Sequence, residues 1–220
     1  MNFSTMWQSW LKATTSPNEA TYAAEREKPE ATLTTALLYV LVYAVIAALV
    51  SMVSAVVFAG SMRGLLPDLL AQADLAPEVR SQLEGILSAT LFAGVGIASS
   101  LANIISIPVF FVIGVGILHL IARLLGGTGQ FGRFAFLNAI FVAPLGILTS
   151  LLGMVPLVSC LTIFIGIYQL VLTYFAVKVE HQLTSGRAIL VVLIPIIVVA
   201  LLVGCVVAGF VGLIVASSQS

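Results

Sequence analysis

Four long stretches of the chain contain no Asp, Glu, Lys or Arg, namely residues 31–62, 85–122, 134–177 and 188–220. Each is longer than the roughly 20 residues that a helix needs to cross a hydrocarbon core. Transmembrane strands would instead be about ten residues long, with every second side chain polar. The pattern therefore predicts an all-α integral membrane protein.

Three of the stretches divide readily into spans. The first span is expected at about 33–60 and the last at about 188–215. The stretch from Phe134 is too long for one helix and is interrupted at Gly153-Met154-Val155-Pro156, which predicts a hairpin of spans at 134–152 and 157–177.

Residues 86–122 are harder to divide, because one helix of this length would measure about 55 Å at 1.5 Å per residue, nearly twice a bilayer core. Lys and Arg favour the cytoplasmic side of a membrane. Five spans and a cytoplasmic N-terminus leave only Arg63 and Arg80 on the far side, whereas six spans would leave six basic residues there. We therefore predict a five-helix bundle, with span two at about 103–123 and a kink at Pro108. The basic residues then on the cytoplasmic side are Lys12, Arg26, Lys28, Arg123, Arg133, Lys178 and Arg187.

The connector at 61–102 is then expected on the non-cytoplasmic side, together with the C-terminus. Pro67-Asp68 and Pro77-Glu78 each have the form of a helix start, with proline at the first position and an acid near the positive end of the helix dipole. The second of these helices is expected to lie in the membrane interface and to lead into span two.

Residues 1–30 form a polar tail in front of a membrane domain at 31–216. Phe3, Trp7, Trp10 and Leu11 fall near one helical face, which predicts an amphipathic interfacial helix, and tryptophan favours the headgroup region. Ser16-Pro17-Asn18-Glu19 has the form of a capping box that starts a second helix. The alternative is a disordered tail.

Composition agrees with a membrane protein, since 60% of the residues are hydrophobic and 8% are charged, against about 25% charged in soluble domains. Nine basic residues balance nine acidic ones, so net charge predicts no nucleic-acid partner. The lipid bilayer is the expected partner. Cys160 and Cys205 fall inside spans, where they are expected to act as small apolar packing residues.

An ionisable group at the centre of a span is usually retained there for function. No such group lies at the centre of a span in this chain, so it offers little for catalysis. His119 and His181 supply fewer than the three protein ligands of a typical catalytic zinc. We therefore predict no enzyme, no metal and no cofactor. His119 remains open as a base for a serine nucleophile or as an axial ligand, and the favoured position is at the membrane interface near Arg123.

Polar and small residues within the spans indicate how the helices pack. Pro108, Pro144 and Pro195 can interrupt helices, and polar span residues can form interhelical hydrogen bonds or, alternatively, a path for an uncharged solute. These polar residues are Asn103, Asn138, Tyr168 and Gln169. Two rows of small residues, which let helices approach closely within the bundle or against a partner, are Ala47, Ser51, Ala55 and Ala59 in the first span and Gly204, Ala208 and Gly212 in the last.

The segment GGTGQFGRF at 126–134 has the glycine spacing of a dinucleotide-binding turn, Gly127-x-Gly129-x-x-Gly132. That function also needs a preceding β-strand and an acidic residue about 20 positions later. A predicted transmembrane helix precedes the segment, and the next acid is Glu180. We therefore predict a tight helix-to-helix turn.

The chain resembles the Yip family, the Ypt- or Rab-interacting membrane proteins. The resemblance lies in HLIARLLGGTGQFGRF, in the following span with Asn138 and Pro144, and in GMVPLVSCLTIFIGIYQLVLTYFAVKVEHQLTSGRAILVVLIP. A Trp-containing start followed by Ser16-Pro17 and Tyr22 is similar to the family's opening. The resemblance implies five spans, a cytoplasmic N-terminus and a role in membrane organisation or vesicle trafficking.

The eukaryotic members of the family bind prenylated small GTPases and have longer cytoplasmic regions before the first span. This chain has about 30 residues there and is more similar to compact prokaryotic members, so the resemblance implies that it is expected in a prokaryotic cytoplasmic membrane. We predict a non-enzymatic scaffold whose partners are other membrane proteins or a small GTPase. The alternatives are an accessory subunit of a larger membrane complex and a transporter of a neutral or lipid-like solute. The candidate contact residues are Trp7, Trp10, Arg123, Arg133, Tyr174, Lys178 and His181.

Overall fold

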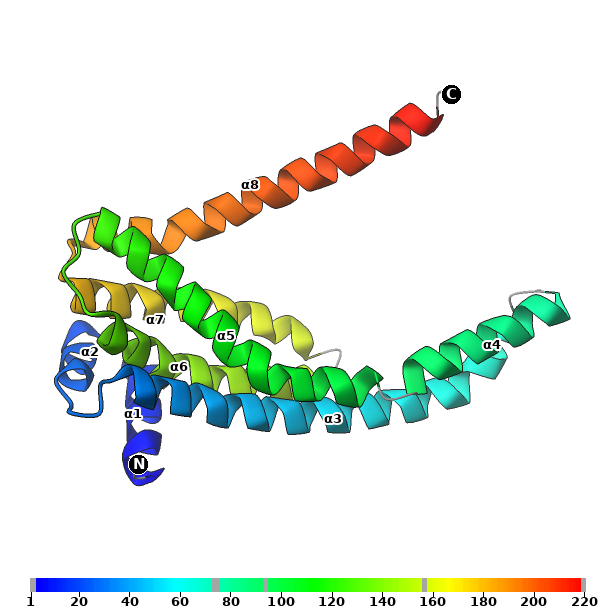
Figure 1. Cartoon of the computed structure of the whole chain (residues 1–220), viewed down its shortest axis with the longest axis horizontal. Helices are drawn as coiled ribbons and strands as arrows, with labels where there is room; N and C mark the ends of the chain where they lie inside the picture. The colour runs from blue at the N-terminus through cyan, green and yellow to red at the C-terminus, as the bar shows by residue number, and fades with distance from the viewer. Residues whose placement is uncertain (1–2, 73–75, 93–94, 156–157, 219–220) are drawn as a thin grey trace.

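All regular elements in the described part of the chain are helices. The structure is a computed structural model that describes residues 3–72, 76–92, 95–155 and 158–218. In chain order (Figure 1) the helices are α1 (Phe3–Thr15), α2 (Glu19–Arg26), α3 (Leu33–Gln72), α4 (Pro77–Phe92), α5 (Val95–Leu124), α6 (Phe131–Leu152), the short 3₁₀ helix η1 (Ser159–Leu161), α7 (Thr162–His181) and α8 (Ser185–Ser218).

Five segments of these helices are long and apolar enough to cross a membrane. The count and the all-helical class confirm the prediction from the charge-free stretches. Helices are favoured because a bilayer supplies no water to the backbone, so each spanning segment must satisfy its own N–H and C=O groups. The chain is a multi-pass integral membrane protein, with candidate spans at Leu33–Ser61, Ser100–Leu124, Phe131–Leu152, Ser159–His181 and Ser185–Phe210.

Helix α6 is the centre of the bundle. Eight consecutive residues, from Phe134 to Phe141, are each at most 2% exposed, so this part of the helix is covered on every side. Tyr39 of α3 packs on Phe136 with ring centroids 5.9 Å apart, and Tyr22 of α2 packs on Phe141 at 6.4 Å. The core therefore joins the spans to the N-terminal helices.

Helices α3 and α4 form a hairpin that extends beyond the rest of the bundle (Figure 1). With 40 residues, α3 is about 60 Å long, roughly twice the thickness of a hydrocarbon core. It continues through Pro67, so the predicted helix start there was wrong. The predicted start at Pro77 is correct, with Glu78 in the first turn of α4. Helix α4 packs alongside α3, and its position in the membrane interface stays a prediction.

Over residues 185–210, for which side-chain surroundings are described, helix α8 packs on the bundle only near its start. Ala188 and Val191 are fully buried, whereas Val199, Leu202 and Val206 are exposed, and α8 diverges from the other spans beyond its first turns (Figure 1). The exposed side chains are apolar, as expected of a surface that faces lipid.

Helices α1 and α2 lie against the end of the bundle where α3 begins (Figure 1). Asn18 caps α2, because its side-chain oxygen accepts a hydrogen bond from the Thr21 N–H at 2.8 Å. The predicted capping box at Ser16 was therefore placed two residues too early, and Pro17 precedes the cap. Asn18 succeeds because its carbonyl oxygen lies three residues before an N–H that the first turn leaves unpaired.

We expect Asn18→Ala to destabilise the protein by about 1 kcal/mol, since the Thr21 N–H would lose its partner. Ser16→Ala is the matched control and should change stability little. Thermal unfolding of the detergent-solubilised protein measures both variants. An equal loss in the two variants would show that Ser16 shares the cap.

Candidate functional site

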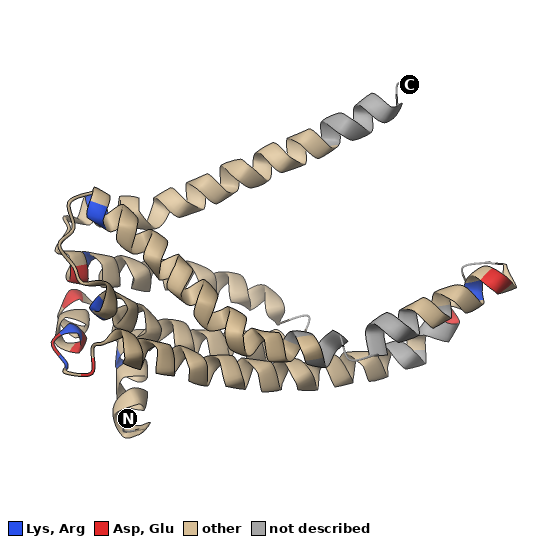
Figure 2. Cartoon of the chain, in the orientation of Figure 1, with Lys and Arg blue, Asp and Glu red and all other residues tan. Residues whose placement is uncertain are grey.

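The polar end of the bundle is the candidate site, and we define it as residues 3–32, 119–134 and 178–187. Helices α1 and α2, the α5–α6 loop and the α7–α8 turn meet there (Figure 1). Figure 2 shows charged residues gathered at this end of the ribbon, with a smaller group at the tip of the α3–α4 hairpin. The polar end contains seven of the nine Lys and Arg residues of the sequence.

A buried carboxylate joins three segments of the polar end. Glu180, at the end of α7, is 1% exposed. Its Oε1 accepts a hydrogen bond from the Gln130 N–H at 2.7 Å, and its Oε2 lies 2.9 Å from Arg26 Nε of α2. The arginine contact is a close ion pair whose angles are not those of a hydrogen bond. Removing one member of a buried pair typically costs about 3–5 kcal/mol, because the other charge is left uncompensated.

The two histidines of the chain contact each other beside this carboxylate. His119 Nδ1 of α5 lies 3.2 Å from His181 Nε2 of α7, and the tautomers decide which nitrogen donates. Phe134 packs edge-on against His181 with ring centroids 5.0 Å apart. The described residues contain no group of three or more His, Cys, Asp or Glu that could hold a metal ion. The pair therefore serves as a hydrogen-bonded contact between α5 and α7.

The glycine loop packs directly on Glu180 and His181. The Thr128 N–H donates to the His181 carbonyl at 3.2 Å, and the Gly127 N–H donates to the Ala122 carbonyl at 2.8 Å. A Cβ on Gly129 would lie 2.7 Å from the Glu180 carbonyl oxygen, closer than real side chains approach. The preceding Gly126 has φ +91°, which favours glycine. The loop is a tight turn from helix to helix, and its glycines allow the backbone of α7 to approach.

The N-terminal helices are fastened to the polar end by aromatic and polar contacts. Tyr22 is fully buried between Phe141 and Phe175, and burial raises the pKa of its hydroxyl, so the phenol stays neutral. Lys178 of α7 donates to the Glu19 carboxylate at the start of α2. These contacts show that the N-terminal segment is folded against the spans.

The structure divides the candidate contact residues into exposed and buried ones. Trp7 and Arg123 are exposed, whereas Arg133, Tyr174 and Lys178 are half-buried. Trp10 and His181 are buried. We expected both to be contact residues, but a buried side chain cannot be part of a contact surface. Trp10 packs edge-on against Tyr39 with ring centroids 5.9 Å apart, because α1 turns this side chain toward α3.

Sequence reasoning missed the roles of Glu180 and Arg26. One indication was available, since Glu180 is the first acid after residue 84 and directly precedes His181. Its partner on α2 has no sequence signature, because the two residues belong to helices that are brought together only by the fold.

A second candidate site is a partly polar cavity of about 450 Å³ between α3, α5 and α6. It lies toward the far end of the bundle, beside Gly153 at the end of α6. Ser100 Oγ donates to Ser51 Oγ at 3.1 Å next to it. Asn138 does not reach this cavity, because its amide donates to the Phe134 carbonyl within α6. The polar residues that line the cavity are Tyr43, Ser51, Ser54, Asn103 and Ser150.

The two rows of small residues differ in their surroundings. In α3, Ala47 is buried and Ser51 lines the cavity, whereas Ala55 and Ala59 are half-buried. In α8, Gly204 and Ala208 are exposed, and a Cβ on Gly204 would meet open space. Gly212 lies outside the residues whose surroundings are described, and so does Pro156 of the predicted break between spans.

These features define a class of five-span integral membrane protein whose N-terminal helices fold back onto the polar end of the bundle. Comparison with protein families matches the Yip1 domain over residues 11–208. The chain therefore belongs to the Yip1 domain family, as its sequence pattern indicated. Comparisons with curated proteins and with solved structures returned no match.

We expect Gly129→Ala to destabilise the protein by about 1–3 kcal/mol, because the new methyl group would force the loop away from Glu180. Gly114→Ala is the matched control, since a Cβ there meets open space and alanine favours a helix. Thermal unfolding in detergent compares them. Equal stability of the two variants would contradict the close approach of the loop to α7.

Proposed function

We propose that the protein is a non-enzymatic membrane scaffold that binds a peripheral protein at its polar end. Yip family proteins are membrane proteins that are involved in trafficking, and they are generally not enzymes. The observation that carries the proposal is the set of polar contacts that join several helices at the polar end. Three segments, α2, α5 and α7, are joined there by Arg26–Glu180, the histidine pair and Lys178–Glu19, which builds a surface of fixed shape.

The distribution of charge supports a cytoplasmic position for this surface. Seven basic residues lie at the polar end, and only Arg63 and Arg80 belong to the opposite side. Short loops that are rich in Lys and Arg are retained on the cytoplasmic side of the membrane. The carboxyl end of α8 is then on the opposite side, and the organism we favour remains a prokaryote.

The exposed bases near the α5–α6 loop are the proposed contact. Arg123 makes no ion pair within the described part of the chain. Arg187 makes none there either, and its Nη1 donates to the Leu125 carbonyl at 3.3 Å. Uncompensated bases on a rigid surface favour an acidic partner through electrostatic complementarity. The partner class is an acidic soluble protein, of which a small GTPase is one case.

We expect combined Arg123→Glu and Arg187→Glu to abolish binding of that partner without unfolding the protein. Washed inside-out vesicles would be incubated with the cytosolic fraction of the source cell, and bound proteins would be identified by mass spectrometry. Arg80→Glu is the control at the opposite end, where it reverses the charge of one basic residue rather than two.

Specific binding to inside-out vesicles that is lost only in the double variant supports the proposal. Binding only to right-side-out vesicles would overturn the orientation. Retention of a stoichiometric integral complex by every variant would favour the accessory-subunit alternative, for which the uncovered row at Gly204 and Ala208 offers a surface.

The cavity between α3, α5 and α6 favours a second candidate function, the passage of an uncharged solute. Polar side chains at membrane depth usually face one another or a cavity, and Asn103 and Ser150 do so here. Gln169 is not among the residues that line the cavity, so the path we consider excludes it.

If this second function holds, Asn103→Leu should slow glycerol efflux from proteoliposomes, followed by light scattering, at least several-fold. Ser150→Ala should slow it less. Thr149→Val is the matched control, since Thr149 bonds the Leu145 carbonyl and does not line the cavity. Efflux no faster than in protein-free liposomes would exclude the passage of this solute and leave the scaffold function.

A further inference from the structure

Helix α1 has three faces, of which only one is covered by protein. Met6, Trp10 and Ala13 are buried against the bundle. Phe3, Trp7 and Leu11, spaced by four residues and therefore aligned on the helix, are 70%, 49% and 45% exposed. On a third side, Gln8 and Lys12 are exposed.

The buried and the uncovered apolar residues belong to one continuous arc of the helix. Trp7 and Trp10 are in contact, with ring centroids 6.4 Å apart, and lie on adjoining faces. The bundle thus covers one part of this arc and leaves Phe3, Trp7 and Leu11 uncovered. Three large apolar side chains in a row are more than the scattered exposure normal for a water-facing helix.

The position of α1 along the bundle matches the membrane interface. Trp10 contacts Tyr39, which lies six residues after the first residue of α3 and hence about 9 Å along that helix. The Tyr168 hydroxyl of α7 donates to the Thr14 carbonyl at 2.6 Å, which fixes the other end of α1. Interfacial helices bury their apolar face about 5–10 Å into the boundary between headgroups and acyl chains.

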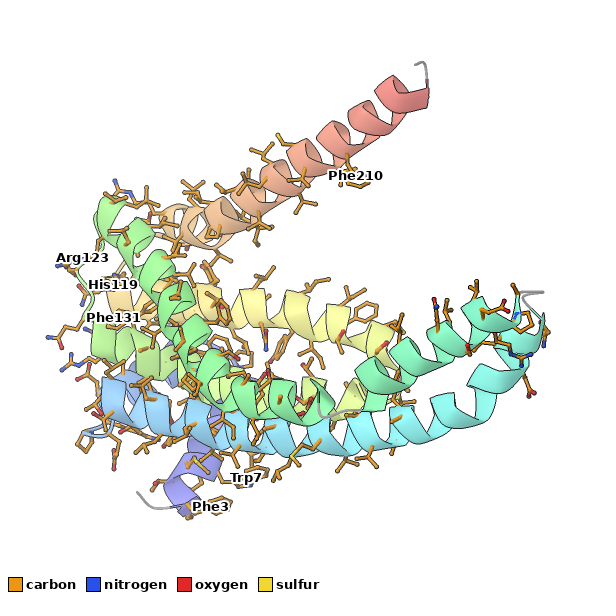
Figure 3. The ribbon with its side chains drawn as sticks, turned by 45° about the vertical axis from the view of Figure 1, so that its right-hand side comes forward. Phe3, Trp7, His119, Arg123, Phe131 and Phe210 are labelled. Atoms are coloured by element: carbon orange, nitrogen blue, oxygen red, sulfur yellow. The ribbon has the colours of Figure 1, made fainter. Side chains whose placement is uncertain are left out.

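The direction of the uncovered row agrees with this position. Helix α1 lies across the bundle axis (Figure 1), and Figure 3 shows Phe3 and Trp7 on the side of α1 toward which the spans extend. The neighbouring α3 exposes Leu38, Leu41 and Val45, apolar residues of a membrane span. The uncovered row therefore lies on the side of α1 toward which the apolar spans extend (Figure 3).

We propose that the Phe3-Trp7-Leu11 face of α1 binds the bilayer itself, inserting among the upper acyl chains of the leaflet that surrounds the polar end. Lys12 and Gln8 then face the headgroups and water. This assignment removes Trp7 from the protein-contact surface and does not depend on the identity of any partner. Trp10 and Tyr168 connect the inserted helix to α3 and α7, so α1 has a fixed depth relative to the spans.

The chain provides its own probes, because Trp7 and Trp10 are its only tryptophans. In Trp10→Phe the emission reports Trp7, and in Trp7→Phe, the matched control, it reports the buried Trp10. The purified full-length variants would be reconstituted in phosphatidylcholine bilayers with bromines on either the upper or the lower part of the acyl chain. Aqueous iodide would be the second quencher.

We expect bromines on the upper chain to quench Trp7 several-fold more strongly than they quench Trp10, and more strongly than bromines on the lower chain do. Iodide should quench Trp7 weakly. Strong quenching by iodide without quenching by brominated lipid would overturn the proposal, because Trp7 would then face water. Protection from both quenchers would also overturn it, because protein would then cover the face. If Trp10→Phe does not fold, the difference in quenching between the wild-type protein and Trp7→Phe gives the contribution of Trp7.

Discussion

The arrangement of the polar end depends on one buried carboxylate. Glu180 is inaccessible to water, and a buried charge is tolerated only when it is paired and hydrogen-bonded. Arg26 provides the opposite charge from α2, and the Gln130 N–H provides the hydrogen bond at the start of α6. Because each partner belongs to a different segment, satisfying this one group requires α2, α6 and α7 to meet. The glycine loop can then pack close enough to cover it.

The rest of the bundle follows the rules of a lipid solvent. Lipid is as apolar as a leucine side chain, so burial of apolar surface does not drive the spans together as it does in water. Close packing around α6 and the aromatic contacts of Tyr39 and Tyr22 hold the bundle instead. Between Val192 and Phe210, helix α8 makes few such contacts, and its side chains there are mostly exposed.

The N-terminal segment connects three environments through a few side chains. Tyr22 and Trp10 enter the protein core, Trp7 lies on the face that we assign to lipid, and Lys12 lies on the exposed polar side. The scaffold that we propose would present its contact surface at a fixed height above the membrane. The bases near Arg123 then lie on the outer side of the polar end, beyond the inserted helix, where a peripheral protein can approach.

The sequence by itself determined the five spans, the clustering of charge at one end and the amphipathic first helix. These follow from local patterns, because a charge-free stretch of sufficient length must satisfy its own backbone in lipid. Only the tertiary structure decided that Glu180 pairs with Arg26, that Trp10 and His181 are buried, and that α4 returns along α3. The spans are apolar on all sides, so they lack the periodicity that marks a packing face in a soluble protein. Their contacts depend on shape and on a few polar groups, which become neighbours only when the helices have assembled.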